Sequence, residues 1–207
     1  MTGALPPGGV LLPEDPTWDP LLPREVAQRL ADVEVPWYVA GGWALDLHRG
    51  HISREHADLE IAVPAADFPV IREALPDLEF LVVGSGRAWP LDSPAYEVMH
   101  QTWGRDRTSG VWRLDVFREP HEAGAWICRR DRSIRRPYRE IICRTADGVP
   151  YLTPEIVLLF KAKHNRPKDD ADFAASLPLL TPEQRAWLAG ALRAIHPGHI
   201  WLPPLAN

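Results

Sequence analysis

The chain has 207 residues, of which 45% are hydrophobic, and its formal net charge is −5 at pH 7. This length can bury the core of one domain, with or without a helical extension, and the negative charge excludes a global positive field that would hold nucleic acid. Cys128 and Cys143 have no paired spacing, no apolar run approaches a membrane span, and the N-terminus lacks a signal-peptide pattern. We therefore expect a cytoplasmic protein without a disulfide framework, a zinc site or a membrane partner.

The first half of the chain predicts alternating helices and strands after a proline-rich, extended lead-in over residues 1–23. Apolar side chains at helical spacing indicate helices, and short apolar or alternating runs indicate strands. In chain order the predicted elements are a helix over 24–34, a strand over 37–40, a helix over 41–48, a strand over 58–63, a helix over 64–75 and a strand over 80–83. Gly41-Gly42 begins the second of these helices, and Gly50 ends it.

The second half predicts a strand, a hairpin and three helices. Residues 87–110 are polar and ambiguous, residues 111–117 predict a strand, and residues 138–143 and 149–152 predict a hairpin around Asp147-Gly148. The three helices begin near Pro154, Pro167 and Pro182. We expect an α/β (α+β) fold, with a small mixed sheet and its helices over residues 24–152 and a C-terminal helical segment over residues 153–196.

Two acidic residues on the strand over 58–63 are the first sign of a metal site. The alternation places Asp58 and Glu60 on one face and Leu59, Ile61 and Val63 on the other. Residues two apart on a strand have Cα atoms roughly 6.5 Å apart, so both side chains can converge on a divalent cation. Read alone, each acid would be a surface position or the partner of an arginine.

Asp115 is the best candidate for a third carboxylate. It lies in an apolar run, where an unpaired carboxylate costs several kcal/mol unless it meets a cation or an ordered partner. Three such groups are the ligands that two-metal phosphoryl-transfer sites need. We expect Asp115 to be a metal ligand, a general base on the attacking hydroxyl, or both.

Gly41-Gly42 lies between an apolar strand and a helix, where backbone N–H groups can cradle phosphate. Trp43 reads as a core residue or as a platform for a nucleobase. Asp46 is one helical turn from Arg49 and can pair with it. Arg54 and His56 flank the acids, and His56 reads either as a site residue or as a satisfied structural histidine. The three lysines, at positions 161, 163 and 168, fall within eight residues, by chance or because a phosphate contact favours a compact ammonium group.

These motifs resemble the signature of a known family. The motifs are Gly-Gly-Trp-Ala-Leu-Asp-Leu at 41–47, Gly50, Arg-Glu-His at 54–56 and Asp-Leu-Glu-Ile at 58–61. They resemble small nucleotidyltransferases similar to aminoglycoside 2''-adenylyltransferase and lincosamide nucleotidyltransferases, in the polymerase-beta-like superfamily. The runs at 151–155 and 166–173 resemble the helical segment of the same family, so the similarity extends over residues 24–190.

The resemblance implies a magnesium-dependent enzyme that transfers a nucleoside monophosphate from an NTP, expected to be ATP, to a hydroxyl of a small molecule, of which an aminoglycoside-like antibiotic is one candidate, and releases pyrophosphate. It implies that Asp58, Glu60 and Asp115 bind metal and act in catalysis. It also implies that the NTP is bound by four residues, which are Gly41, Gly42, Arg54 and Lys168. The chain departs from the superfamily pattern at two positions. Trp43 stands where the superfamily has serine, and Glu60 stands where it has aspartate.

Two alternatives remain open at this point. The first is nucleotidylation of tRNA or protein, for which the arginines between Arg129 and Arg139 form a basic cluster that could hold RNA. That cluster also reads as a solvated loop or hairpin edge. The second alternative is an inactive nucleotide-binding module, against which the intact acids argue.

Overall fold

The computed structural model describes residues 5–164 and 166–206. The chain forms two compact units. Unit 1 comprises the chain up to Trp37 together with Ala57–Pro120, and unit 2 comprises Tyr38–His56 together with the chain from His121 onward. Among the described residues no helix is long and apolar enough to cross a membrane. The sequence predicted a division of the chain into residues 24–152 and 153–196. Each of the two units instead combines two separate stretches of the chain, and the predicted division stays a prediction.

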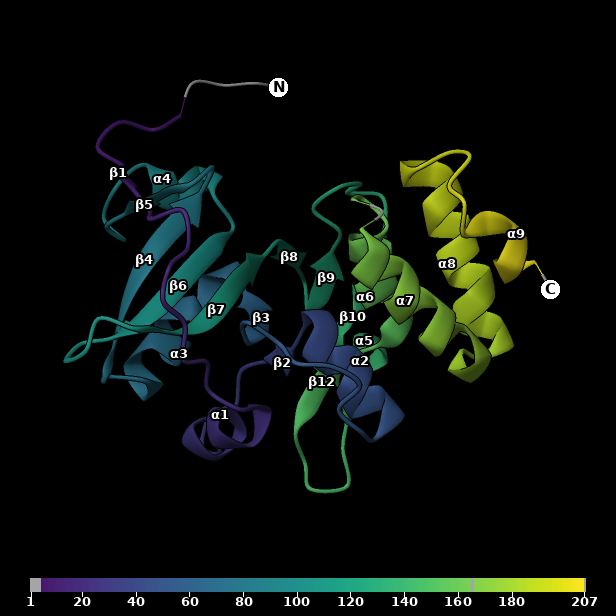
Figure 1. The fold of residues 1–207 in the computed structure, drawn as a ribbon, viewed down its shortest axis with the longest axis horizontal. Helices are drawn as coiled ribbons and strands as arrows, with labels where there is room; N and C mark the ends of the chain where they lie inside the picture. Colours follow the sequence, from purple (N-terminus) through teal and green to yellow (C-terminus); the bar gives the residue numbers. More distant parts are fainter. Residues whose placement is uncertain (1–4, 165, 207) are drawn as a thin grey trace. The chain divides into compact units, whose positions relative to one another are not determined.

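Unit 1 is built on strands in the order β1-β5-β4-β6-β7-β3 (Figure 1). Their bounds are Val10–Leu11 (β1), Arg87–Trp89 (β5), Leu78–Gly84 (β4), Gln101–Asp106 (β6), Trp112–Glu119 (β7) and Glu60–Pro64 (β3). Neighbours are antiparallel except β3 and β7, which are parallel. The sheet is therefore mixed, as the sequence predicts.

Helices cover one face of this sheet. Unit 1 contains α1 (Pro23–Arg29), the 3-10 turn η1 (Ala65–Asp67), α3 (Phe68–Ala74) and α4 (Ala95–Val98). Phe68 of α3 packs edge-on against Phe80 of β4, with ring centroids 5.5 Å apart. Because side chains alternate along a strand, Glu79 and Leu81 of β4 lie on the opposite face. We call that opposite face the open face of unit 1.

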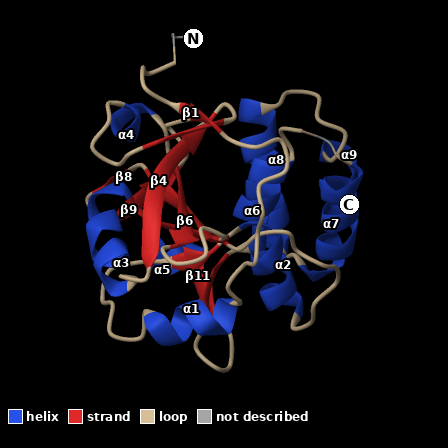
Figure 2. Cartoon of the chain, turned by 60° about the vertical axis from the view of Figure 1, so that its left-hand side comes forward, coloured by secondary structure: helices blue, strands red, loops and turns tan. Residues whose placement is uncertain are grey.

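Unit 2 combines short strands with a helical bundle (Figure 2). Its strands are β2 (Tyr38–Val39), β12 (Pro150–Leu152) and β11 (Ile142–Arg144) in that order, and β10 (Arg135–Pro137), β9 (Ala125–Ile127) and β8 (His121–Glu122) in a separate sheet. Its helices are α2 (Gly41–Arg49), α5 (Tyr138–Ile141), α6 (Pro154–Lys161), α7 (Pro167–Ser176), η2 (Leu177–Leu179), α8 (Pro182–Ile195) and α9 (Leu202–Leu205). Ile156–Leu159 of α6 are buried, so α6 forms the core of the helical part.

The predicted α/β fold is confirmed, and most predicted elements occur near their expected positions. Gly50 ends α2 in the left-handed conformation, and Thr181 with Gln184 forms a capping box at the start of α8. The helix expected over 24–34 is too long, because α1 ends at Arg29 and a turn at Leu30–Val33 follows it.

Two further predictions differ from the structure. The first strand of the hairpin begins at Ile142 rather than Tyr138, because a helical turn, α5, follows Pro137. The ambiguous region 87–110 contains β5, α4 and β6. Its polar residues concealed these elements because one face of β6 is only half-buried and carries polar side chains, so the apolar content of the strand is low.

Candidate active site

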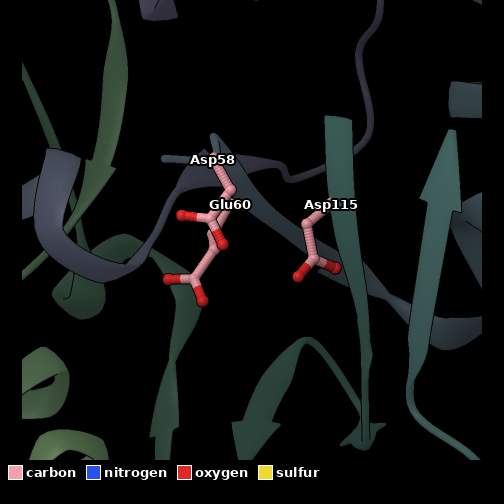
Figure 3. A group of neighbouring side chains, drawn as sticks. All are labelled: Asp58, Glu60 and Asp115. Carbon is pink, nitrogen blue, oxygen red and sulfur yellow. The ribbon is translucent and has the colours of Figure 1, made fainter. Parts of the chain in front are cut away.

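The structure brings the three predicted acids together in unit 1 (Figure 3). Asp58 precedes β3, Glu60 is the first residue of β3, and Asp115 is paired with Glu60 in the parallel register of β3 and β7. The Asp115 N–H donates to the Leu59 carbonyl at 2.9 Å, which continues this pairing. One carboxylate oxygen from each acid lies within 4.8 Å of the others. The convergence therefore follows from strand register.

Asp115 is held in an environment that disfavours its negative charge. Its side chain is almost completely buried. Burial raises the pKa of Asp115 well above its usual range, and the charges of Glu60 and Asp58 raise it further, although a hydrogen bond from Gln101 opposes the rise. The Gln101 Nε2 donates to Oδ2 of Asp115 at 2.5 Å, and Oδ1 is buried without a hydrogen-bond partner among the described residues.

A divalent cation fits this arrangement. Three carboxylates supply the hard oxygen donors that Mg²⁺ prefers, and the buried, unpartnered Oδ1 of Asp115 is an acceptor that a cation would satisfy. The mutual repulsion that raises the pKa of Asp115 would be relieved by the same positive charge. The residues thus fit the predicted metal, while their catalytic roles stay predictions.

The di-glycine turn in unit 2 has a structural role that sequence reasoning missed. Gly41 begins α2 with φ of +59°, a left-handed conformation that glycine adopts at no steric cost. A Cβ on Gly42 would lie 2.5 Å from Nη2 of Arg54 and 2.7 Å from Cε1 of His56. The glycine motif and the Arg-Glu-His motif are therefore packed against each other, which explains why no side chain is present at position 42.

His56 is a satisfied structural histidine rather than a member of the acidic site. Its Nε2 is 2.8 Å from Oδ2 of Asp46, and its ring stacks on Trp43 with centroids 4.5 Å apart. Asp46 also accepts hydrogen bonds from Ser53 and, as the sequence predicts, from Arg49 at 3.0 Å. Burial raises the pKa of Asp46, but the hydrogen bonds from His56 and Ser53 outweigh it and lower the pKa below its usual value.

Arg54 belongs to a second group of charges in unit 2. Its Nη2 is 3.5 Å from Oδ2 of Asp172 in α7, and the same carboxylate is 2.9 Å from Nζ of Lys161. Lys161 also lies 3.3 Å from the buried Asp169. The predicted lysine, Lys168, is instead exposed near the start of α7. The proposed NTP contacts of Gly41, Gly42, Arg54 and Lys168 stay predictions. The ion pairs of Asp172 with Arg54 and with Lys161 are contacts that the sequence did not predict.

The arginine cluster is largely used inside unit 2. Arg130 donates to the carbonyls of Leu159 and Phe160 at 2.9 and 2.8 Å. Arg136 donates to the buried Glu155 at 2.6 Å. These contacts favour the reading of this segment as part of the fold over its reading as an RNA-binding surface.

Solved structures with this fold include two adenylyltransferases. Lincosamide antibiotic adenylyltransferase LnuA, in a lincomycin-bound structure, is 17% identical to the chain with a TM-score of 0.51, and the match covers 73% of this chain and 91% of that chain. ANT(2")-Ia, in complex with adenylyl-2"-tobramycin, is 16% identical with a TM-score of 0.57, and the match covers 83% of this chain and 94% of that chain. No curated protein matches the sequence.

The chain has the mixed α/β fold of these nucleotidyltransferase structures, and the acidic cluster lies within it. The sequence model of the family described as aminoglycoside-2''-adenylyltransferase matches residues 23–88, about a third of the chain, including the glycine motif, Asp58 and Glu60. The predicted resemblance to this family is therefore confirmed.

Proposed function

We propose that the chain is a magnesium-dependent enzyme that transfers a nucleoside monophosphate from an NTP, with ATP as the expected donor, to a hydroxyl of a small molecule and releases pyrophosphate. The observation that carries this proposal is the convergence of Asp58, Glu60 and Asp115, together with the Oδ1 of Asp115, which is buried without a hydrogen-bond partner among the described residues. The family match and the names of the two similar structures support an antibiotic of the aminoglycoside or lincosamide kind as the acceptor.

Asp58, Glu60 and Asp115 are the residues that would hold Mg²⁺. When bound, the metal supplies positive charge that offsets the charge of the triphosphate and of the pyrophosphate leaving group. Three carboxylates whose oxygens lie within 4.8 Å of one another concentrate negative charge at one place, which supports the assignment.

The chain's own residues supply the remaining functions. Asp115 accepts the proton of the acceptor hydroxyl as a general base. The acceptor oxygen forms a bond to the α-phosphorus as the bond to the pyrophosphate oxygen breaks. The N–H groups at the start of α2, with Arg54 beside Gly42, are suited to bind phosphate oxygens. Lys168 completes the proposed NTP contacts.

A pyrophosphate-release screen tests the proposal. ATP and GTP are combined with Mg²⁺ and with aminoglycosides, lincosamides or bulk tRNA. We expect release with a small-molecule acceptor, and a loss of at least about 100-fold in Asp58→Asn, because removing a catalytic carboxylate commonly costs that much. Asp92→Asn is the matched control, since Asp92 is an exposed acid of the same unit. Equal activity of Asp58→Asn and the wild type would refute the proposal, and release with tRNA alone would redirect it to RNA.

A further inference from the structure

We infer that Gln101 is a positioning residue of the acidic site, which holds one oxygen of Asp115 so that the other oxygen is presented to the cation. The inference deepens the proposed function and rests on it, because it concerns the same metal site. In this arrangement Asp58, Glu60 and Asp115 supply the ligand oxygens, and Gln101 sets the orientation of the carboxylate that is buried.

The two oxygens of the Asp115 carboxylate have different surroundings. Oδ2 accepts a hydrogen bond from Nε2 of Gln101 at 2.5 Å, whereas Oδ1 is buried and has no hydrogen-bond partner among the described residues. A buried acceptor without a partner is unfavourable, because it has lost its hydrogen bonds to water. A cation that binds Oδ1 removes this penalty and does not displace Gln101. One oxygen is therefore suited to hold the side chain and the other to bind the metal.

Gln101 and Glu60 approach Asp115 from opposite sides. β7 lies between β6, which begins at Gln101, and β3, which begins at Glu60. Gln101 is opposite Phe117 in the register, so it is a diagonal neighbour of Asp115 on the open face of unit 1. Glu60 is opposite Asp115 itself, and Figure 3 shows Asp58 and Glu60 together on one side of Asp115. A hydrogen bond from the β6 side is therefore compatible with a cation on the β3 side.

The backbone around Gln101 is held by Arg118, a buried residue of β7 that is 3% exposed. The Arg118 guanidinium donates to the Met99 carbonyl at 2.5 Å and to Oγ1 of Thr102 at 2.9 Å. The backbone N–H of Arg118 donates to the His100 carbonyl at 2.7 Å. These acceptors lie on both sides of Gln101 in the chain, so the start of β6 is fixed to the strand that carries the buried acid.

The donor is neutral, which suits a carboxylate that must also bind a cation. Neither a lysine nor an arginine pairs with Asp115 in the part of the chain that the structure describes. In contrast, the buried Asp46 pairs with Arg49 at 3.0 Å, and Asp172 pairs with Lys161 at 2.9 Å. A charged donor compensates a carboxylate and repels a metal ion, whereas an amide orients the carboxylate and leaves its negative charge for the metal.

Trp103 provides a spectroscopic reporter of the acidic site. It is directly opposite Asp115 in the register of β6 and β7, where facing side chains are about 5 Å apart. Its ring packs against those of Trp18 and Trp112, with centroids 5.0 and 5.3 Å away. Excited indole transfers energy to Tb³⁺ over such short distances, and Tb³⁺ takes the hard oxygen ligands that Mg²⁺ also takes. Sensitised Tb³⁺ emission therefore reports on binding at the three acids.

Titration of Tb³⁺ into the full chain, without nucleotide or acceptor, tests the inference. The Tb³⁺ affinity comes from the sensitised emission, the Mg²⁺ affinity from competition, and the number of water molecules on bound Tb³⁺ from emission lifetimes in H₂O and D₂O. Gln101→Met removes the donor and keeps the length of the side chain. We expect it to weaken the affinity for both ions about tenfold and to add about one water molecule to bound Tb³⁺, because Asp115 turns away and water replaces its oxygen.

Three further variants make the result specific. Asp115→Ala removes the ligand itself and gives the reference gain in bound water. Gln28→Met is the matched control, because Gln28 is exposed on α1 of the same unit, and it should change neither the affinities nor the bound water. Gln101→Asn has an amide one methylene too short to reach Oδ2, so it should resemble Gln101→Met, and it stays polar if methionine prevents folding. A loss of stability alone would not change the bound water of the folded protein.

The outcomes separate the inference from the proposed function. Unchanged affinities and unchanged bound water in both Gln101 variants, with binding still dependent on Asp58, would overturn the inference and leave the proposed function standing. Tighter binding in these variants would also overturn the inference, because Gln101 would then compete with the metal for Asp115. If Asp58→Asn and Asp115→Ala both bind Tb³⁺ as the wild type does, the acidic cluster is not the metal site, and the proposed function is refuted together with the inference.

Discussion

Replacing Gly42 by alanine should destabilise unit 2, because the space beside Gly42 is filled by a ring that cannot move. The added Cβ would lie 2.5 Å from Nη2 of Arg54, which is the flexible end of a partly exposed side chain and can shift. It would also lie 2.7 and 2.8 Å from Cε1 and Nδ1 of His56, whose ring is held by Asp46 at 2.8 Å and stacked on Trp43. Relief requires His56 to leave one of these partners.

The magnitude follows from two opposing effects. Overpacking of a fixed site costs about 1–3 kcal/mol. Alanine gains up to about 1 kcal/mol over glycine in a helix, although position 42 is in the first turn, where the gain is smaller. We therefore expect the free energy of unfolding of Gly42→Ala to fall by about 1–2 kcal/mol. Urea denaturation monitored by far-ultraviolet circular dichroism measures this change.

Gly190→Ala is the matched control, because Gly190 lies inside α8 and its Cβ would meet no atom within 4 Å. Helix propensity alone should raise the stability of this variant by about 0.5–1 kcal/mol. The two substitutions are chemically identical and should have opposite signs. If Gly42→Ala is as stable as Gly190→Ala, the ring of His56 is not fixed, and the structural explanation of the glycine motif is wrong.

Two further predictions concern buried carboxyls. Asp115→Asn should lower nucleotidyl transfer at least about 100-fold and yet raise the urea midpoint of the protein kept in chelator at pH 7. The reason is that a pKa raised by folding destabilises the folded state increasingly as the pH rises above the unfolded-state pKa of Asp115; a lower midpoint would contradict this. Asp46 has a lowered pKa, so its contribution to stability is complete above the unfolded-state pKa and is lost as the pH falls through the folded-state pKa. Urea titrations from pH 6 to pH 3 should show the stability gap between wild type and Asp46→Asn closing at the acid end, and a gap independent of pH would contradict the assignment.

The acidic site could be predicted from the sequence because its geometry follows from local pattern and strand pairing. The alternation of residues 58–63 placed Asp58 and Glu60 on one face, and the apolar run around Asp115 marked it as a buried carboxyl. The polar partners could not be predicted in the same way. Gln101 lies in a polar stretch, and its contact with Asp115 depends on the register of β6 against β7. No sequence spacing reports that register.

The packing inside unit 2 was also outside the reach of sequence reasoning. A glycine pair before a helix has the same pattern whether it serves phosphate or makes room for another side chain. In this chain Gly42 makes room for the side chain of His56. The backbone N–H groups at the start of α2 are still available to bind phosphate. Likewise, Lys161 and Asp172 are ordinary helical residues in the sequence, and only the packing of α6 against α7 pairs them.

Asp46 and Asp115 show how the surroundings of two buried carboxyls differ in the same chain, and Asp115 is the one that we propose to be functional. Both are buried, but donors from Ser53, Arg49 and His56 surround Asp46, and its pKa is lowered. Asp115 accepts a hydrogen bond from Gln101 but has two acidic neighbours, and burial together with their charges raises its pKa. A fold gains nothing from the second arrangement unless a cation or a proton arrives there. The contrast in surroundings, rather than burial itself, is therefore the physical reason to place the chemistry at Asp115.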